Sequence, residues 1–143
     1  GTIEKDTGTT AMTPVGIFMG CFYTDPTTSQ PTWNQMWPTG TVATDAMAFV
    51  LDDPDAVFRM QANGSLAQTT LGNNIAVTQT SGSTTIMRSK NSVTASSAAT
   101  TNTLPLRILE FMNGPDSVVG DAYTDVLLTY VAGMHQYRTA LGV

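Results

Sequence analysis

Short apolar stretches with the two-residue alternation of β-strands are the main pattern along this chain. Residues 14–23 are apolar at both alternating sets of positions, and Gly16 and Gly20 lie in one of these sets. A strand that is apolar on both faces is typical of the centre of a β-sandwich or barrel. Glycines within it let a neighbouring backbone or ring approach closely. We therefore predict a central strand here, ending at the turn Asp25-Pro26.

Two more alternating stretches lie in the last third of the chain. Residues 104–112 place Leu106, Ile108 and Met112 on one side, and residues 124–131 alternate in the same way. The two stretches are predicted to form an antiparallel pair that closes a small barrel.

Shorter elements are expected between these stretches. They are strands at 46–51 and 56–61 joined by the tight acidic turn 52–55, one helical turn within 65–71, and a hairpin of 75–80 with 84–87 around Ser81-Gly82-Ser83. Residues 96–103 are too polar for a core, so they are predicted to be an exposed loop or an ordered arm. Residues 132–143 read as a C-terminal tail.

Composition supports the same fold class. The 143 residues are enough for one domain, 1–143, and only 12% of them are charged, about half the usual share. Thr, Ser, Gly and Asn, which are poor helix formers, take the place of the missing charged residues. We predict an all-β fold, a small antiparallel β-barrel or β-sandwich with long loops and at most a short helical turn. A surface with so little charge also suggests coverage in an assembly.

Charge and hydropathy argue against two classes of partner. The net charge is −5 and the six basic residues are scattered singly, so no patch suited to a nucleic-acid backbone is expected. No apolar run reaches the 18 residues that indicate a transmembrane helix, so no membrane partner is expected either.

Candidate chemistry is sparse. Cys21 and His135, the chain's single cysteine and histidine, lie far apart in sequence, and no Gly-x-Ser-x-Gly motif is present. The carboxylates Asp52, Asp53 and Asp55 lack calcium-loop spacing and read as a solvated turn. We therefore expect no enzyme, no catalytic or metal-binding residues and no cofactor.

Aromatic residues are the candidates for binding. The polar, proline-containing segment 25–41 carries both tryptophans, Trp33 and Trp37. This segment is predicted either to fold back as a lid on the core or to reach a neighbouring subunit. The candidate interface residues are Trp33, Trp37, Tyr23 and Tyr137.

Four segments carry a resemblance to a known family: PVGIFMGCFYTDP (14–26), WPTGTVATDAMAFVLDDPD (37–55), LPLRILEF (104–111) and VGDAYTDVL (119–127). In their order they resemble small structural proteins of marine and cyanobacterial tailed bacteriophages, usually encoded near the major capsid protein. Similar proteins begin with a further N-terminal region, and this chain starts at Gly1 without an initiator Met. We therefore expect it to be part of a longer protein.

The resemblance implies a virion protein on the capsid surface that decorates or cements the phage head. Its partner would be the major capsid protein, and a homotrimer is favoured because a β-barrel or sandwich sits at a local three-fold in similar head proteins. Three copies binding together would also gain avidity. The alternatives are another virion component, such as a head fibre base or a tail tube or adaptor subunit, and a carbohydrate-binding module.

Overall fold

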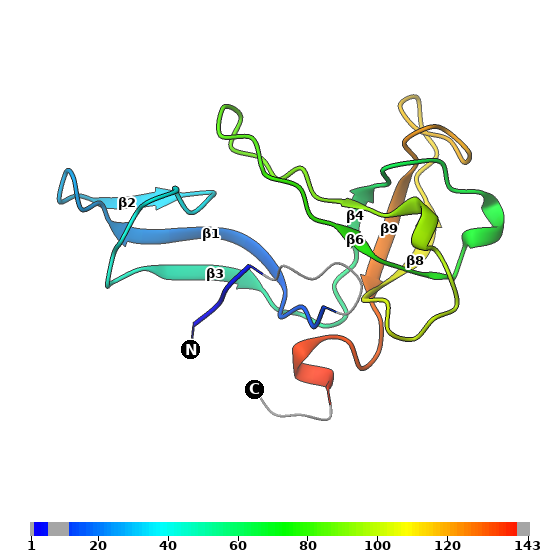
Figure 1. The fold of residues 1–143 in the computed structure, drawn as a ribbon, viewed down its shortest axis with the longest axis horizontal. Helices are drawn as coiled ribbons and strands as arrows, with labels where there is room; N and C mark the ends of the chain where they lie inside the picture. The colour runs from blue at the N-terminus through cyan, green and yellow to red at the C-terminus, as the bar shows by residue number, and fades with distance from the viewer. Residues whose placement is uncertain (1, 6–11, 140–143) are drawn as a thin grey trace.

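The computed structural model describes residues 2–5 and 12–139, and in them the chain is built from strands and three short 3₁₀ turns. The strands are β1 (Ile17–Thr24), β2 (Pro31–Asn34), β3 (Met47–Leu51), β4 (Phe58–Gln61), β5 (Asn74–Ile75), β6 (Val77–Thr78), β7 (Ser92–Val93), β8 (Leu106–Phe111) and β9 (Asp125–Tyr130). The 3₁₀ turns are η1 (Gln68–Thr70), η2 (Ala95–Ser97) and η3 (Gln136–Arg138). Figure 1 shows two parts, a body formed by β4–β9 and a sheet of β1–β3 that projects from it.

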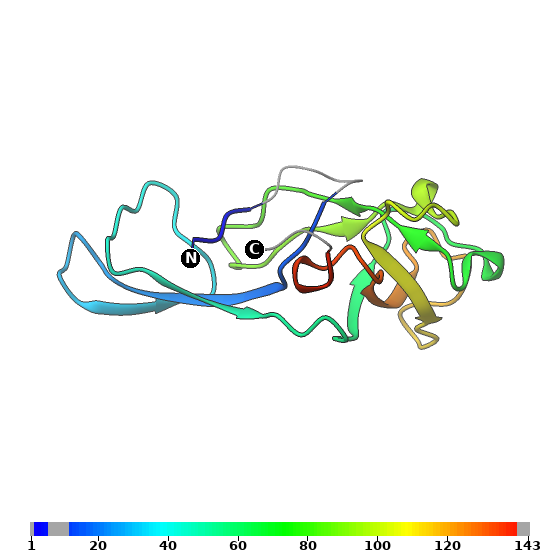
Figure 2. The ribbon, with the colours of Figure 1, turned by 90° about the horizontal axis from the view of Figure 1, so that it is seen from below.

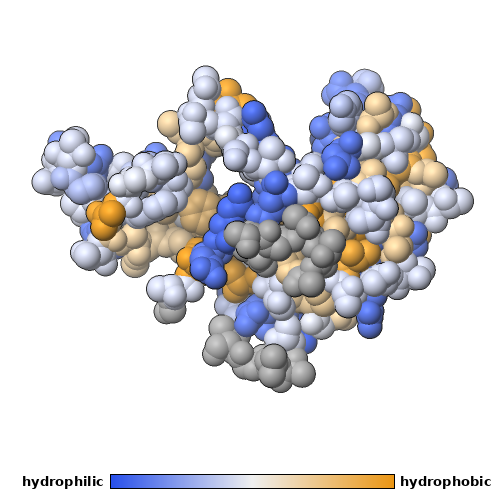
Figure 3. Space-filling model, viewed as in Figure 1, coloured by the Kyte–Doolittle hydropathy of each residue, from blue (hydrophilic) through white to orange (hydrophobic). Residues whose placement is uncertain are grey.

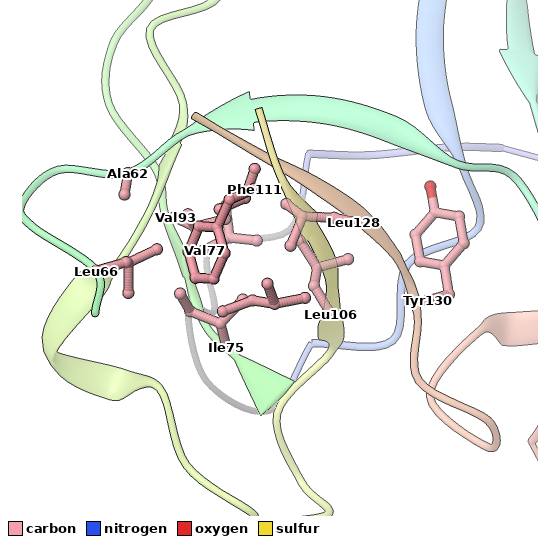
Figure 4. Close-up of a cluster of buried hydrophobic side chains, with 11 residues drawn as sticks. Ala62, Leu66, Ile75, Val77, Val93, Leu106, Phe111, Leu128 and Tyr130 are labelled. Carbon is pink, nitrogen blue, oxygen red and sulfur yellow. The ribbon is translucent and has the colours of Figure 1, made fainter. Parts of the chain in front are cut away.

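The body holds the main core. Its four-stranded antiparallel sheet has the order β4-β9-β8-β5, and β6 pairs separately with β7. The chain runs on from β5 into β6, and a bridge between Ala62 and Val93 links the end of β4 to β7. Side chains from both sheets, among them Leu106, Leu128 and Val77, meet in one buried cluster (Figure 4). Strands thus surround this core on several sides, although each sheet is open.

The projecting sheet has the order β2-β1-β3, and both pairings are antiparallel. The register between β1 and β3 shifts between Phe18 and Gly20, so Met19 is an extra residue in β1. This β-bulge bends the strand locally. The sheet extends along the long axis of the molecule, away from the main core (Figures 1 and 2).

The predicted all-β class is confirmed, with long loops and helical structure limited to short turns. The antiparallel pairing of 104–112 with 124–131 is also confirmed, as β8 with β9. The helical turn predicted within 65–71 is η1, and Gly72 follows it with a positive φ of 81°.

Three local predictions differ in part from the structure. Residues 14–23 do supply the central strand of a sheet, as β1 between β2 and β3, but this sheet is not packed as a sandwich because one side of it is open to solvent. The segment 25–41 is not all loop, because Pro31–Asn34 pairs with β1 as β2. The hairpin pairs Val77 with Val93, and its Ser83–Arg88 bridge moves the tip to residues 84–87.

Of the predicted C-terminal tail 132–143, the structure describes residues 132–139, and residues 140–143 lie outside the described part. His135 is fully buried there, and the Gln136 N–H donates to the Pro14 carbonyl at 2.9 Å.

Acidic residues 52–55 do form a turn, but it joins β3 to β4, and these strands belong to different sheets. The turn therefore connects the projecting sheet to the body.

Candidate docking surface

One side of the projecting sheet presents a row of large apolar side chains to solvent. Phe22 of β1 lies opposite both Trp33 of β2 and Met47 of β3, and alternation adds Phe49 and Leu51 on the same side. We call these five residues the apolar face. Each is between 39% and 59% exposed. Five large side chains left half in water on one sheet face are unusual, because scattered single ones are the norm on soluble proteins.

A glycine sets the geometry of the apolar face. Gly20 has a φ of 147°, and the Trp33 ring lies across it to meet Phe49, with ring centroids 5.1 Å apart. A Cβ atom built at Gly20 would lie 2.5 Å from Trp33 Cζ2. The absence of a side chain here therefore lets one aromatic pair span all three strands.

A loop covers the opposite side of the sheet. Residues 35–46, which we call the covering loop, place Trp37 edge-on against Tyr23 with ring centroids 5.1 Å apart. The Cys21 thiol donates to the Met36 carbonyl at 3.5 Å, and burial raises the pKa of this thiol. Figure 2 shows the covering loop on one side of the sheet only. The projecting sheet therefore has a covered side and an open side.

Asp45 fastens the end of the covering loop. The Thr24 hydroxyl donates to its carboxylate at 2.6 Å, and the Thr24 N–H lies 3.1 Å from the same oxygen. These hydrogen bonds stabilise the charged form and so lower the pKa of Asp45. The loop is thus held against β1 at both its tryptophan and its carboxylate.

The four predicted interface residues are found in different settings. Trp33 lies on the apolar face, and Trp37 is partly exposed on the covered side. Tyr23 is only 3% exposed, and its hydroxyl accepts a hydrogen bond from Asn34, so it is a packing residue within this chain. Neither tryptophan closes over the main core, since both lie in the projecting sheet and its loop.

Tyr137 belongs to another part of the molecule. Its hydroxyl donates to Asp52 at 3.1 Å, and this hydrogen bond, with the charge of the same carboxylate, raises the pKa of Tyr137. Arg138 pairs with Asp55 at 2.6 Å. η3 is therefore tied to the acidic turn that leaves the projecting sheet, and the Tyr137 hydroxyl is already hydrogen-bonded within this chain.

Sequence reasoning missed four members of the apolar face: Phe22, Met47, Phe49 and Leu51. The alternation of Met47, Phe49 and Leu51 is a visible signal, but the same alternation is typical of a strand that faces a core. A two-residue alternation identifies which side chains share a face, and it does not say whether that face is covered.

The residues considered for chemistry do not form a common site. Cys21 lies in the projecting sheet, whereas His135 packs against Tyr130 at the base of the body, with ring centroids 4.9 Å apart. Nδ1 of His135 accepts the N–H of Tyr137. Within residues 2–5 and 12–139, no group of three His, Cys, Asp or Glu residues is placed to hold a metal ion.

On the face of the molecule that Figure 3 shows, residues of intermediate hydropathy predominate, with strongly hydrophilic and strongly hydrophobic residues scattered among them. Among these residues no helix is long and apolar enough to cross a membrane. Comparisons with protein-family models, with curated proteins and with solved structures gave no match.

Proposed function

We propose that this chain is a non-enzymatic virion structural protein that decorates and stabilises the head of a tailed phage by binding the lattice of the major capsid protein. The observation that carries the proposal is the apolar face, carried on a sheet that projects beyond the body. The resemblance of residues 14–26, 37–55, 104–111 and 119–127 to small phage structural proteins points to the same role.

The size of the apolar face suits a protein partner. Five side chains of about 200 Å² each, half exposed, give about 500 Å² of apolar surface. A stable protein interface buries about 800 Å² on each partner, with an apolar centre and a polar rim. The apolar face supplies such a centre. The polar side chains Thr32 and Asn34 of β2 lie on the other side of the same strand, so neither places a polar group on the apolar face that binding would have to desolvate.

Stabilisation would follow from mass action. A protein that binds the assembled lattice, and not the unassembled capsid subunits, adds its binding free energy to the stability of the shell. No chemical reaction is needed for this role, and rigid attachment is its only requirement.

A carbohydrate-binding module is supported less well by the same geometry. Sugar recognition needs hydrogen-bonding side chains beside the aromatic platform, because polar groups fix the orientation of a ligand. The side chains directly beside Trp33, Phe22 and Phe49, have no nitrogen or oxygen, and the hydroxyl of Thr24 on the same side of β1 already donates to Asp45. This composition favours a protein surface as the partner.

The test is cosedimentation of the purified chain with capsid shells and, separately, with unassembled capsid protein from the same phage. We expect binding to shells only and a higher melting temperature of the decorated shell. Trp33→Ala removes a central aromatic contact and should weaken binding by about 30-fold, corresponding to about 2 kcal/mol. The matched control is Tyr123→Ala, which removes an exposed aromatic residue from the body and should leave binding unchanged.

Three outcomes would contradict the proposal. They are failure to bind shells, equal binding by the Trp33→Ala variant, and density for the chain on the tail of the virion in electron micrographs of whole particles.

A further inference from the structure

β3 is an exposed edge of the projecting sheet. It lies at the end of the order β2-β1-β3, so within residues 2–5 and 12–139 no strand pairs with the backbone groups on its outer side. Unpaired edge strands present a row of N–H and C=O groups that can pair with another strand. Proteins usually block such edges with charged side chains, proline, short length or a covering segment.

The other described edges have one of these protections. β2 begins with Pro31, which has no N–H to donate. β4 carries Arg59 and is bridged to β7 beyond its end, while β5 is only two residues long and is bridged to Ala99. β3 has five residues, all uncharged, without proline or glycine. Among the described strands, β3 is thus the edge most open to pairing.

We propose that β3 pairs antiparallel with β3 of a second copy of this chain, about a two-fold axis that passes beside Phe49. This inference does not rest on the proposed function, because it concerns the free protein in solution. It also differs from the trimer expected from the family resemblance, since a strand paired with its own copy about a two-fold axis closes as a dimer.

The sequence of β3 is complementary to its own reverse. With Phe49 opposite Phe49 of the partner subunit, Met47 faces Leu51 of the partner subunit, and Ala48 faces Val50 of the partner subunit. Aromatic pairs and aliphatic pairs across antiparallel strands are stabilising. A charged residue at the axis would face its own copy and be repelled, and Met47–Leu51 has none.

The pairing would join two projecting sheets into one sheet of six strands. The two-fold axis is perpendicular to the joined sheet, so both apolar faces lie on the same side and form one surface of about 1,000 Å². Five paired residues span only about 17 Å, so the dimer alone is a weak contact. Two joined faces that bind one surface would gain affinity through avidity.

Charges gather just outside the paired strands. Asp45 of one copy lies near Asp52 and Asp53 of the partner subunit at each end of the contact, given the register centred on Phe49. These carboxylates repel across a solvent-exposed gap, and salt screens such repulsion. Raising the salt concentration should therefore strengthen the dimer.

The test is sedimentation velocity of the whole chain from about 1 μM to about 1 mM, the range in which weak dimers dissociate. Phe49→Lys and Phe49→Glu each place like charges at the axis, and each should weaken dimerisation at least tenfold. An equimolar mixture of the two variants places lysine opposite glutamate and should dimerise again. Val42→Lys, in the covering loop, introduces the same charge away from the edge and should dimerise like the unmodified chain.

Ala48→Lys provides a second block that keeps the contact between Phe49 and Trp33, with circular dichroism as the check on folding. A monomer throughout the concentration range, or dimers of Ala48→Lys as tight as those of the unmodified chain, would overturn the proposal. Folded Phe49→Lys and Phe49→Glu chains that do not dimerise when mixed would overturn the register. These measurements contain no capsid shell, so their failure leaves the shell-binding test unaffected.

Discussion

Replacing Gly20 by alanine tests whether the apolar face depends on the close approach of a ring to the backbone. Two separate costs are expected. The backbone of Gly20 has a φ of 147°, which side-chain-bearing residues rarely adopt. The new methyl group would also lie 2.5 Å from Trp33 Cζ2, so the ring would have to leave its position beside Phe49.

The size of the effect follows from these two costs. An unfavourable backbone conformation costs about 1–3 kcal/mol, and inserting a methyl group into a packed contact costs about another 1–3 kcal/mol. Gly40 allows the two to be separated. It also has a positive φ, 81°, but no atom lies within 4 Å of the place that a Cβ would take there, so Gly40→Ala meets only the backbone cost.

Tryptophan fluorescence during urea unfolding is the assay, because both tryptophans of the chain, Trp33 and Trp37, lie in the projecting sheet and its loop. The signal therefore reports this sheet and not the body. With a urea dependence of about 2 kcal/mol per molar, the midpoint of Gly20→Ala should lie about 0.5–1.5 M below that of Gly40→Ala. Equal midpoints for the two variants would refute the role given to the contact of Trp33 with Gly20.

Two further predictions concern the loop and the core. The hydrogen bonds from Thr24 lower the pKa of the Asp45 carboxyl. This carboxylate therefore stabilises the fold when the pH is above its unfolded-state pKa of about 3.8, and the stabilisation is lost as the pH falls through the lower pKa of the folded state. Lowering the pH should therefore reduce the urea midpoint, followed by tryptophan fluorescence, less in Asp45→Asn than in the unmodified chain. The same dependence of the urea midpoint on pH in both chains would contradict this. Ile108→Ala, at a fully buried position in the core of the body, should lower the free energy of unfolding measured by circular dichroism by about 3–5 kcal/mol, and a loss below about 1 kcal/mol would show that the site is not tightly packed.

Sequence patterns predicted the body well because its strands have one buried face. Ile108 and Leu128 alternate with more exposed residues, so apolar periodicity alone predicts both strands, which proved to pair antiparallel. The hairpin was harder. Its strands are two residues long, and residue type favours a turn at Ser81-Gly82-Ser83, whereas the Ser83–Arg88 bridge shifts the turn toward Met87, which has a φ of 51° despite not being glycine.

The apolar face could not be predicted from alternation because both sides of β1 are apolar. Cys21 and Phe22 point to opposite sides, and the difference between them arises from the covering loop, which packs Met36 and Trp37 over Cys21 and Tyr23. That packing joins residues more than ten positions apart through a loop of irregular structure. Local periodicity carries no information about such a contact.

Binding and folding of the projecting sheet are coupled through the same side chains. The buried cluster of the chain runs from Ala62 to Tyr130 and lies wholly in the body, whereas the projecting sheet buries little beyond Cys21 and Tyr23. A region with few buried apolar contacts opens more readily than the rest of a protein. A partner that covers the apolar face would supply the second covered side that this sheet lacks, and its binding free energy would be added to the stability of the sheet. Hydrogen exchange in β1–β3 should therefore slow on binding by more than exchange in β8 and β9.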